Sequence, residues 1–179
     1  MTDGELDLWQ RVESQLRAAV PFVLTLLLAV LCAVPLGIPG LAPVTPLLPA
    51  IAVFYWAIYR PDLMPMIAVV LIGLVHDSLT GTPFGLTAFV LLLVQAVAGS
   101  QRRFFNAKAL PAAWFGFAMI GSGAVALSWL VASLLALEPM PVRPALFQAI
   151  LTVGLYPVVA WPLGFVLQEL LGTLEARAR

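Results

Sequence analysis

The chain has 179 residues, of which 62% are hydrophobic and only 10% are charged. Soluble domains average about 45–50% apolar and about 25% charged residues, so this composition excludes a water-soluble globular enzyme and a disordered chain. Nine basic residues balance nine acidic ones, which leaves no positive field for binding nucleic acid. The mean hydropathy of +1.03 indicates an all-α protein that crosses a membrane several times.

Residues 1–18 are predicted to form an interfacial amphipathic segment. Trp9, Val12 and Leu16 recur at helical spacing, while charged residues occupy the other faces. An aromatic anchor followed by a frayed terminus explains the same pattern equally well. The segment is too acidic for a cleavable signal peptide, which begins with a net basic region.

Charged residues divide the rest of the chain into long apolar stretches. A transmembrane helix needs about 20 mostly apolar residues, and these stretches can supply such helices. They predict six transmembrane helices, at residues 19–38, 46–60, 62–80, 84–101, 111–137 and 145–170. Together these helices form a membrane domain over residues 19–170, and residues 171–179 form a cytoplasmic tail.

The second span is expected to be short and to follow a non-helical segment. Five prolines lie between Pro35 and Pro49, and proline removes a backbone donor from a helix. Residues 35–45 are therefore expected to be extended or turn-like, although they carry no charge. Because lipid does not tolerate unpaired backbone groups, this segment must lie at the interface or against other helices.

The basic residues predict that both termini are cytoplasmic. With six spans, eight of the nine Lys and Arg residues fall on the side of the termini, and only Arg143 falls on the other side. With five spans, Arg60 would lie at the bilayer centre, where a charge is costly. Pro61 predicts a tight cytoplasmic turn after Arg60, and Tyr55 and Trp56 are assigned to the interface beside this turn.

The fifth span carries small residues that lie four or eight positions apart. The predicted helix-packing stripe consists of Gly116, Ala124, Ser128 and Ala132. Small residues at this spacing allow another helix to approach closely. Because alanine is common, a chance pattern is the alternative.

No constellation of catalytic side chains is present. The chain has one histidine and one cysteine, and it contains no nucleotide-binding, hydrolase or metal-ligand motif. Cys32 is interpreted as a small buried hydrophobe. We therefore expect no enzymatic activity, no metal and no cofactor.

One polar cluster stands out at the expected outer end of the third span. Asp77 is an ionisable residue in an apolar stretch, which is a functional hypothesis by default. Arg143 is the only basic residue on that side and hence its candidate partner, whereas His76 points about 100° away around the helix. The main alternative is that Asp77 caps a helix or closes a turn with Gly81 and Gly85. Recognition of a partner or ligand, and a proton relay, are the other possibilities.

Several of these features occur together in one known family. Over residues 20–103, a proline-rich apolar segment precedes Tyr-Trp, Arg-Pro and Gly-Leu-x-x-Asp, followed by Gly81 and Gly85. With six spans and this length, the chain resembles the MreD family, the integral membrane subunit of the bacterial rod-shape machinery. His76 is not expected to be typical of that family, which leaves room for a local role.

The resemblance implies a non-catalytic subunit in the bacterial cytoplasmic membrane. Its partners would be MreC, MreB filaments, RodA and the class-B penicillin-binding transpeptidase, together with membrane lipids. It would help to organise lateral peptidoglycan synthesis. The resemblance also implies a fold similar to the substrate-binding subunits of energy-coupling-factor vitamin transporters.

Two other classes remain open from the residues alone. A vitamin-binding transporter subunit needs an outward pocket with several convergent polar groups. The polar side chains expected on that side are few: Thr45, Asp77, Thr80, Thr82, Glu138 and Arg143. An intramembrane enzyme that acts on lipid-linked intermediates would need acids and bases that this chain lacks.

Overall fold

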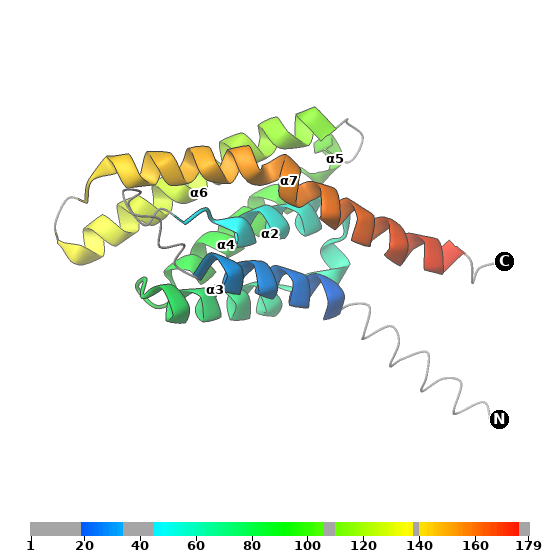
Figure 1. Ribbon diagram of the computed structural model, residues 1–179, viewed down its shortest axis with the longest axis horizontal. Helices are drawn as coiled ribbons and strands as arrows, with labels where there is room; N and C mark the ends of the chain where they lie inside the picture. Colours follow the sequence, from blue (N-terminus) through cyan, green and yellow to red (C-terminus); the bar gives the residue numbers. More distant parts are fainter. Residues whose placement is uncertain (1–18, 34–44, 106–109, 138–139, 176–179) are drawn as a thin grey trace, which may run out of the picture.

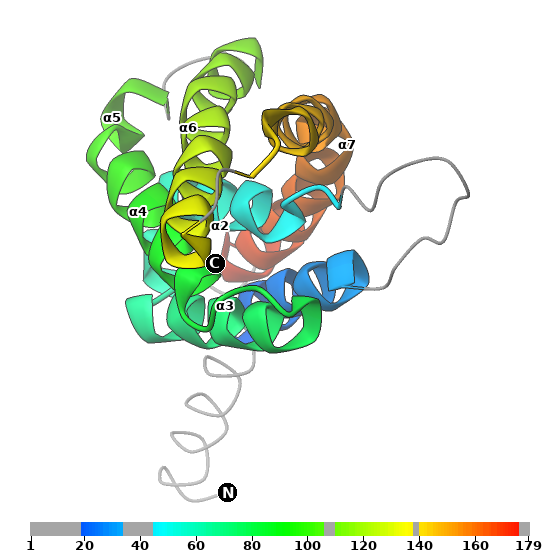
Figure 2. The ribbon, with the colours of Figure 1, turned by 90° about the vertical axis from the view of Figure 1, so that its left-hand side faces the viewer.

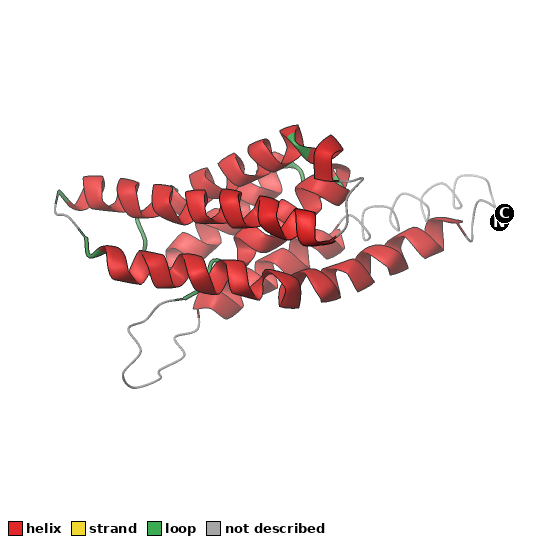
Figure 3. Ribbon diagram, turned by 90° about the horizontal axis from the view of Figure 1, so that it is seen from above, coloured by secondary structure: helices red, strands yellow, loops and turns green. Residues whose placement is uncertain are grey.

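The computed structural model describes residues 19–33, 45–105, 110–137 and 140–175 of the chain. This part of the chain is helical apart from short connections, and no strand occurs in it (Figures 1 and 3). The predictions for residues 1–18, for most of residues 35–45 and for Glu138 concern residues outside these ranges.

Two long and four shorter apolar helices form a bundle. They are the N-terminal helix Ala19–Ala33, α2 (Leu48–Tyr59), α3 (Met66–Thr80), α4 (Leu86–Ser100), α6 (Leu110–Ala136) and α7 (Val142–Glu175). A 3-10 turn, η1 (Pro61–Leu63), joins α2 to α3, and a four-residue helix, α5 (Arg102–Phe105), follows α4.

Each of the six predicted spans overlaps one of these helices, and the described residues form no strand, so the all-α prediction is confirmed. By length and composition, the segments Pro111–Ala136 and Val142–Glu169 qualify as candidate membrane spans, and the other four helices are shorter. α7 has 34 residues and is about 51 Å long, which exceeds the hydrocarbon thickness of about 30 Å. It continues to Glu175, into the segment that was predicted to be a tail. A crossing by all six helices stays a prediction.

The centre of the bundle is α2. Every residue from Leu48 to Ile58 is buried, because α4, α6 and α7 pack around this helix (Figure 2). Its sequence is apolar on all sides, as is typical of a helix inside a protein. With 12 residues it is about 18 Å long, and the prediction of a short second helix is confirmed.

The central position of α2 adds a feature that the sequence did not indicate. Tyr55 and Trp56 are 6% and 0% exposed, so their side chains belong to the core of the bundle. Their placement beside a cytoplasmic interface turn stays a prediction. The predicted turn is present, since α2 is followed by Arg60 and η1 begins at Pro61.

Three aromatic rings hold the long helices on α2. The ring centroids of Phe54 and Phe117 are 5.2 Å apart, and those of Phe117 and Tyr156 are 4.9 Å apart. Phe54 and Tyr156 complete the triangle at 5.9 Å. All three side chains are buried, so α2, α6 and α7 share one continuous core.

The helices α3 and α4 touch through their backbones. A Cβ atom added at Gly73 would lie 2.2 Å from the Cα and 2.5 Å from the N of Ala88. Only glycine permits this approach, because any side chain there would collide with main-chain atoms. The close contact fixes how α3 presents its last turn to α4.

Candidate functional site

The carboxylate of Asp77 lies at the junction of α3 and α4, and this residue is only 1% exposed. Its Oδ1 accepts a hydrogen bond from the Thr82 hydroxyl at 2.7 Å and another from the Thr87 N–H at 3.1 Å. Its Oδ2 accepts the N–H of Gly85 at 2.9 Å. A residue of α3 therefore binds the free N–H groups at the start of α4.

This arrangement is a helix cap supplied from a neighbouring helix. Gly85 occupies the N-cap position of α4 and has no side chain with which to cap it. The first N–H groups of a helix lack partners within the helix, and a negative charge there is favoured by the helix dipole. Asp77 supplies both the acceptor and the charge.

The turn between α3 and α4 depends on two glycines. Gly81 ends α3 with φ +70°, and Gly85 precedes α4 with φ +91°. Both values lie in the left-handed region that side chains with a Cβ rarely adopt. The geometry matches the structural alternative in which Asp77 caps a helix and closes a turn with Gly81 and Gly85.

Arg143 does not take part in this junction. It lies at the start of α7 and is exposed, and within the described ranges no ion pair joins it to Asp77. The carboxylate already accepts hydrogen bonds on both oxygens, which explains why it needs no cation. Among the described residues, an ion pair joins Arg60 and Asp62, at 3.9 Å, in the turn after α2.

His76 belongs to a different environment from its neighbour Asp77. It is 6% exposed, and its Nδ1 lies 3.5 Å from the Thr87 hydroxyl. It lines a cavity of about 300 Å³, which we call the polar cavity. The polar side chains on the wall of this cavity include His76, Thr80, Thr82, Thr87, Ser128 and Gln148.

The polar cavity also receives the end of the predicted packing stripe. Gly116 and Ala124 are buried within the bundle, whereas Ser128 and Ala132 are half-buried and line the cavity. Ser128 donates its hydroxyl to the Ala124 carbonyl at 2.9 Å, so it stays within α6. Small side chains thus leave space at this end of α6 where larger ones would fill it.

A second set of polar contacts holds residues 45–47, the non-helical segment before α2. The Gln148 side-chain amide donates to the Thr45 carbonyl at 2.9 Å, and the Leu47 N–H donates to the Thr152 hydroxyl at 3.0 Å. The thiol of Cys32 donates to the Pro46 carbonyl at 3.1 Å. Of residues 35–45, which were predicted to lie at the interface or against other helices, only Thr45 is described, and it contacts Gln148 of α7.

Replacing Thr152 by valine is expected to lower the free energy of unfolding by about 1–3 kcal/mol, since it leaves the buried Leu47 N–H without an acceptor. Thr152→Ser keeps the hydroxyl and serves as the control. The measurement is the thermal unfolding midpoint of the chain purified in detergent. Equal midpoints for the two variants would show that the hydrogen bond contributes nothing.

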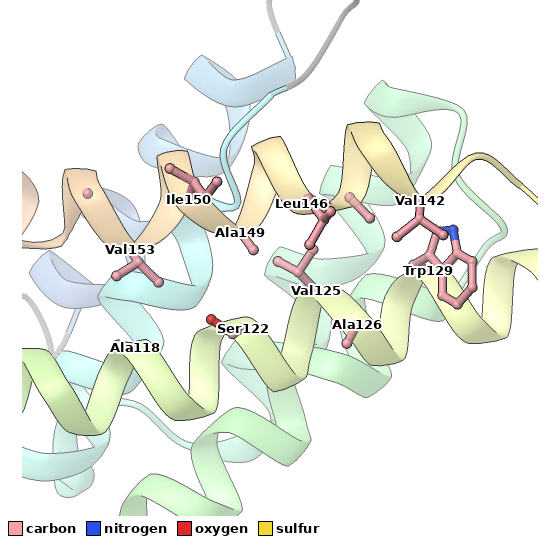
Figure 4. Close-up of a pocket in the computed structure, with 12 residues that line it drawn as sticks. Ala118, Ser122, Val125, Ala126, Trp129, Val142, Leu146, Ala149, Ile150 and Val153 are labelled. Atoms are coloured by element: carbon pink, nitrogen blue, oxygen red, sulfur yellow. The ribbon is translucent and has the colours of Figure 1, made fainter.

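An apolar groove runs between α6 and α7 and has a volume of about 700 Å³. Figure 4 shows its walls, with Ser122, Val125 and Ala126 on α6 facing Ala149 and Val153 on α7. Twelve described residues line it, of which only Ser122 and Trp129 carry a polar side-chain atom. The indole N–H of Trp129 donates to the Met140 carbonyl at 3.2 Å.

The sequence did not single out Thr87, Gln148 or Thr152, although the structure gives each of them polar contacts with a distant part of the chain. Gln148 and Thr152 are four residues apart in an otherwise apolar stretch of α7, residues 144–155, and this spacing is the signal that the sequence offers. Among the described residues, no group of three or more His, Cys, Asp or Glu side chains is placed to hold a metal ion. The site has the chemistry of hydrogen bonding and packing.

Comparison with known proteins gives one family. The family model described as rod shape-determining protein MreD matches residues 12–171 of the chain. No curated protein and no solved structure matches it.

Proposed function

We propose that this chain, which belongs to the MreD family of rod shape-determining proteins, is a non-catalytic subunit of a bacterial rod-shape complex. The observation that carries the proposal is the family match, which extends over residues 12–171. The subunit organises lateral peptidoglycan synthesis through protein–protein contacts. Its partners are MreC, MreB, RodA and the class-B penicillin-binding transpeptidase.

The chemistry of the described residues supports a role without catalysis. The buried carboxylate of Asp77 is already bound by three groups of its own chain, and it holds two helices together. The most apolar windows of α6 and α7 are only 17% and 28% buried inside the bundle. The exposed apolar surfaces of these two helices are suited to contact with lipid or with the membrane segments of other proteins.

Two experiments test the proposal: depletion of the chain in its native bacterium, and purification of the chain from solubilised membranes of undepleted cells. Depletion is expected to turn rods into rounded cells, and MreC is expected to co-purify with the chain. Rods that persist together with a preparation that lacks MreC would contradict the proposal. Recovery of an ATP-hydrolysing module would instead favour the transporter alternative.

The proposed topology places both termini in the cytoplasm. Two observations support it. Eight of nine basic residues fall on that side in the six-span arrangement. The start of the N-terminal helix and the end of α7 lie at the same end of the bundle (Figure 1). The turn between α3 and α4 and the start of α7 lie at the opposite end.

Single cysteines at positions 2, 137 and 178, in a Cys32→Ala background, test this topology. Leu137 is 92% exposed, and its replacement leaves the hydrogen bonds of Asp77 intact. An impermeant maleimide added to intact cells is expected to label only the Leu137→Cys variant. Labelling of Thr2→Cys or Ala178→Cys before permeabilisation would contradict the cytoplasmic placement.

A further inference from the structure

We propose that the polar cavity and the apolar groove form one binding site for an amphiphile with an uncharged, hydroxyl-bearing head group. The cavity has about 300 Å³ and the groove about 700 Å³. Trp129 and Ala145 line both spaces, so the two adjoin. The inference concerns a ligand of the chain itself and does not depend on the proposed function.

The polar cavity offers hydrogen-bonding groups that the protein leaves unused. The Nδ1 of His76 faces the Thr87 hydroxyl, and the side-chain N–H of Gln148 donates to the Thr45 carbonyl. Among the described residues, no hydrogen bond involves the Nε2 of His76 or the Oε1 of Gln148. Both residues line the cavity. A ligand with several hydroxyl groups satisfies such donors and acceptors together.

The lining of the cavity selects against a charged head group. None of its described residues is Lys, Arg, Asp or Glu. Asp77 follows the cavity residue His76 in the sequence, but its carboxylate accepts hydrogen bonds from Gly85 and Thr87 at the start of α4. A phosphate or ammonium group would lose its hydration without gaining a counter-charge, whereas a sugar or glycerol head would not.

The groove supplies the place for an alkyl chain. Val125, Leu146 and Ile150 form its walls, and Leu146 and Ile150 are exposed on α7 (Figure 4). Trp129 stands where the groove meets the polar cavity, and its ring is apolar while its N–H is satisfied by a carbonyl. Tryptophan is suited to such a boundary between an apolar and a polar compartment.

The probe is an alkyl glucoside with a photoreactive diazirine in its chain, added to the purified full-length chain. Cross-linked peptides are expected to come from α6 and α7, and unlabelled octyl glucoside is expected to compete. An alkyl phosphate of the same chain length is expected to compete about tenfold less well, because the cavity lacks a basic group. Equal competition by the two would overturn the assignment of the head group.

Two variants locate the site. Ala126→Phe fills the groove and is expected to abolish the labelling of α7. Gly123→Phe is the matched control, since Gly123 is exposed, does not line the groove, and an added Cβ meets nothing within 4 Å. Labelling that Ala126→Phe leaves unchanged would overturn the proposal.

His76→Leu tests the head-group contact and is expected to weaken glucoside competition about three- to tenfold, the range for one lost hydrogen bond. His76→Gln retains a polar group and is expected to restore most of the affinity. An unaltered affinity in His76→Leu would show that the head group lies elsewhere.

Discussion

Asp77→Ala is expected to lower the free energy of unfolding by about 3–5 kcal/mol, the sum of a lost helix cap and of buried donors left without an acceptor. The N–H groups of Gly85 and Thr87 and the hydroxyl of Thr82 all donate to this carboxylate. Water cannot replace it easily, because Asp77 is 1% exposed. The measurement is the thermal unfolding midpoint in detergent, combined with cell shape on complementation.

Ser78→Ala is the control for this prediction. Ser78 is exposed beside Asp77, and its hydroxyl donates only to the Leu74 carbonyl of its own helix. The thermal unfolding midpoint of the Ser78→Ala variant is expected to match that of the unmodified chain. Identical midpoints for Asp77→Ala and Ser78→Ala would show that the carboxylate does not hold α3 and α4 together.

The same experiment separates capping from ion pairing. Because no ion pair joins Asp77 to Arg143 in the described part of the chain, Arg143→Gln is expected to leave the midpoint unchanged. The effects of Asp77→Asn and Arg143→Gln are then expected to add. If the double variant lowers the free energy of unfolding by less than this sum, the result would support an ion pair between Asp77 and Arg143.

Gly73→Ala is expected to cost about 3 kcal/mol or more, at the upper end of the range for overpacking. The new Cβ would lie 2.2 Å from the Cα of Ala88, and a main-chain atom cannot turn away as a side chain does. α3 and α4 must therefore separate, which also withdraws Asp77 from the start of α4. The amount of monodisperse protein after heating measures the loss.

Gly99→Ala is the matched control, and it is expected to change the stability in the opposite direction. Gly99 lies in α4, and a Cβ there would meet nothing within 4 Å. Alanine favours a helix over glycine by about 0.5–1 kcal/mol, so this variant is expected to be stabilised. Ala88→Gly is not expected to rescue Gly73→Ala, because the collision is with the backbone. A rescue would contradict the geometry.

The sequence was most informative where local chemistry decides the structure. The spacing of Asp77, Gly81 and Gly85 allowed a capped turn to be considered, because glycine and a short acidic side chain have few roles at a helix end. The short second helix followed from the prolines before it and from Arg60 and Pro61 after it. In these places the residues that matter lie within a few positions of one another.

The sequence was least informative about which apolar surfaces face one another. The prediction that places Tyr55 and Trp56 beside the interface turn gives no sign that other helices enclose α2 and bury both side chains. In a membrane protein, lipid-facing and buried helices are both apolar, so hydrophobicity does not distinguish them. Gln148 and Thr152 were missed for a related reason: their partners on the 45–47 segment lie 103 and 105 residues away in the chain.

That separation has a consequence for the order of events during synthesis. The Thr45 carbonyl and the Leu47 N–H obtain their partners only when the start of α7 has been made. At a translation rate of about 5–20 residues per second, this takes about 5–20 s after the ribosome has passed them. During this interval α2 is too short to cross the hydrocarbon layer alone, and its leading backbone groups are unpaired. We therefore expect the insertion machinery or bound water to satisfy these two backbone groups until the start of α7 has been made.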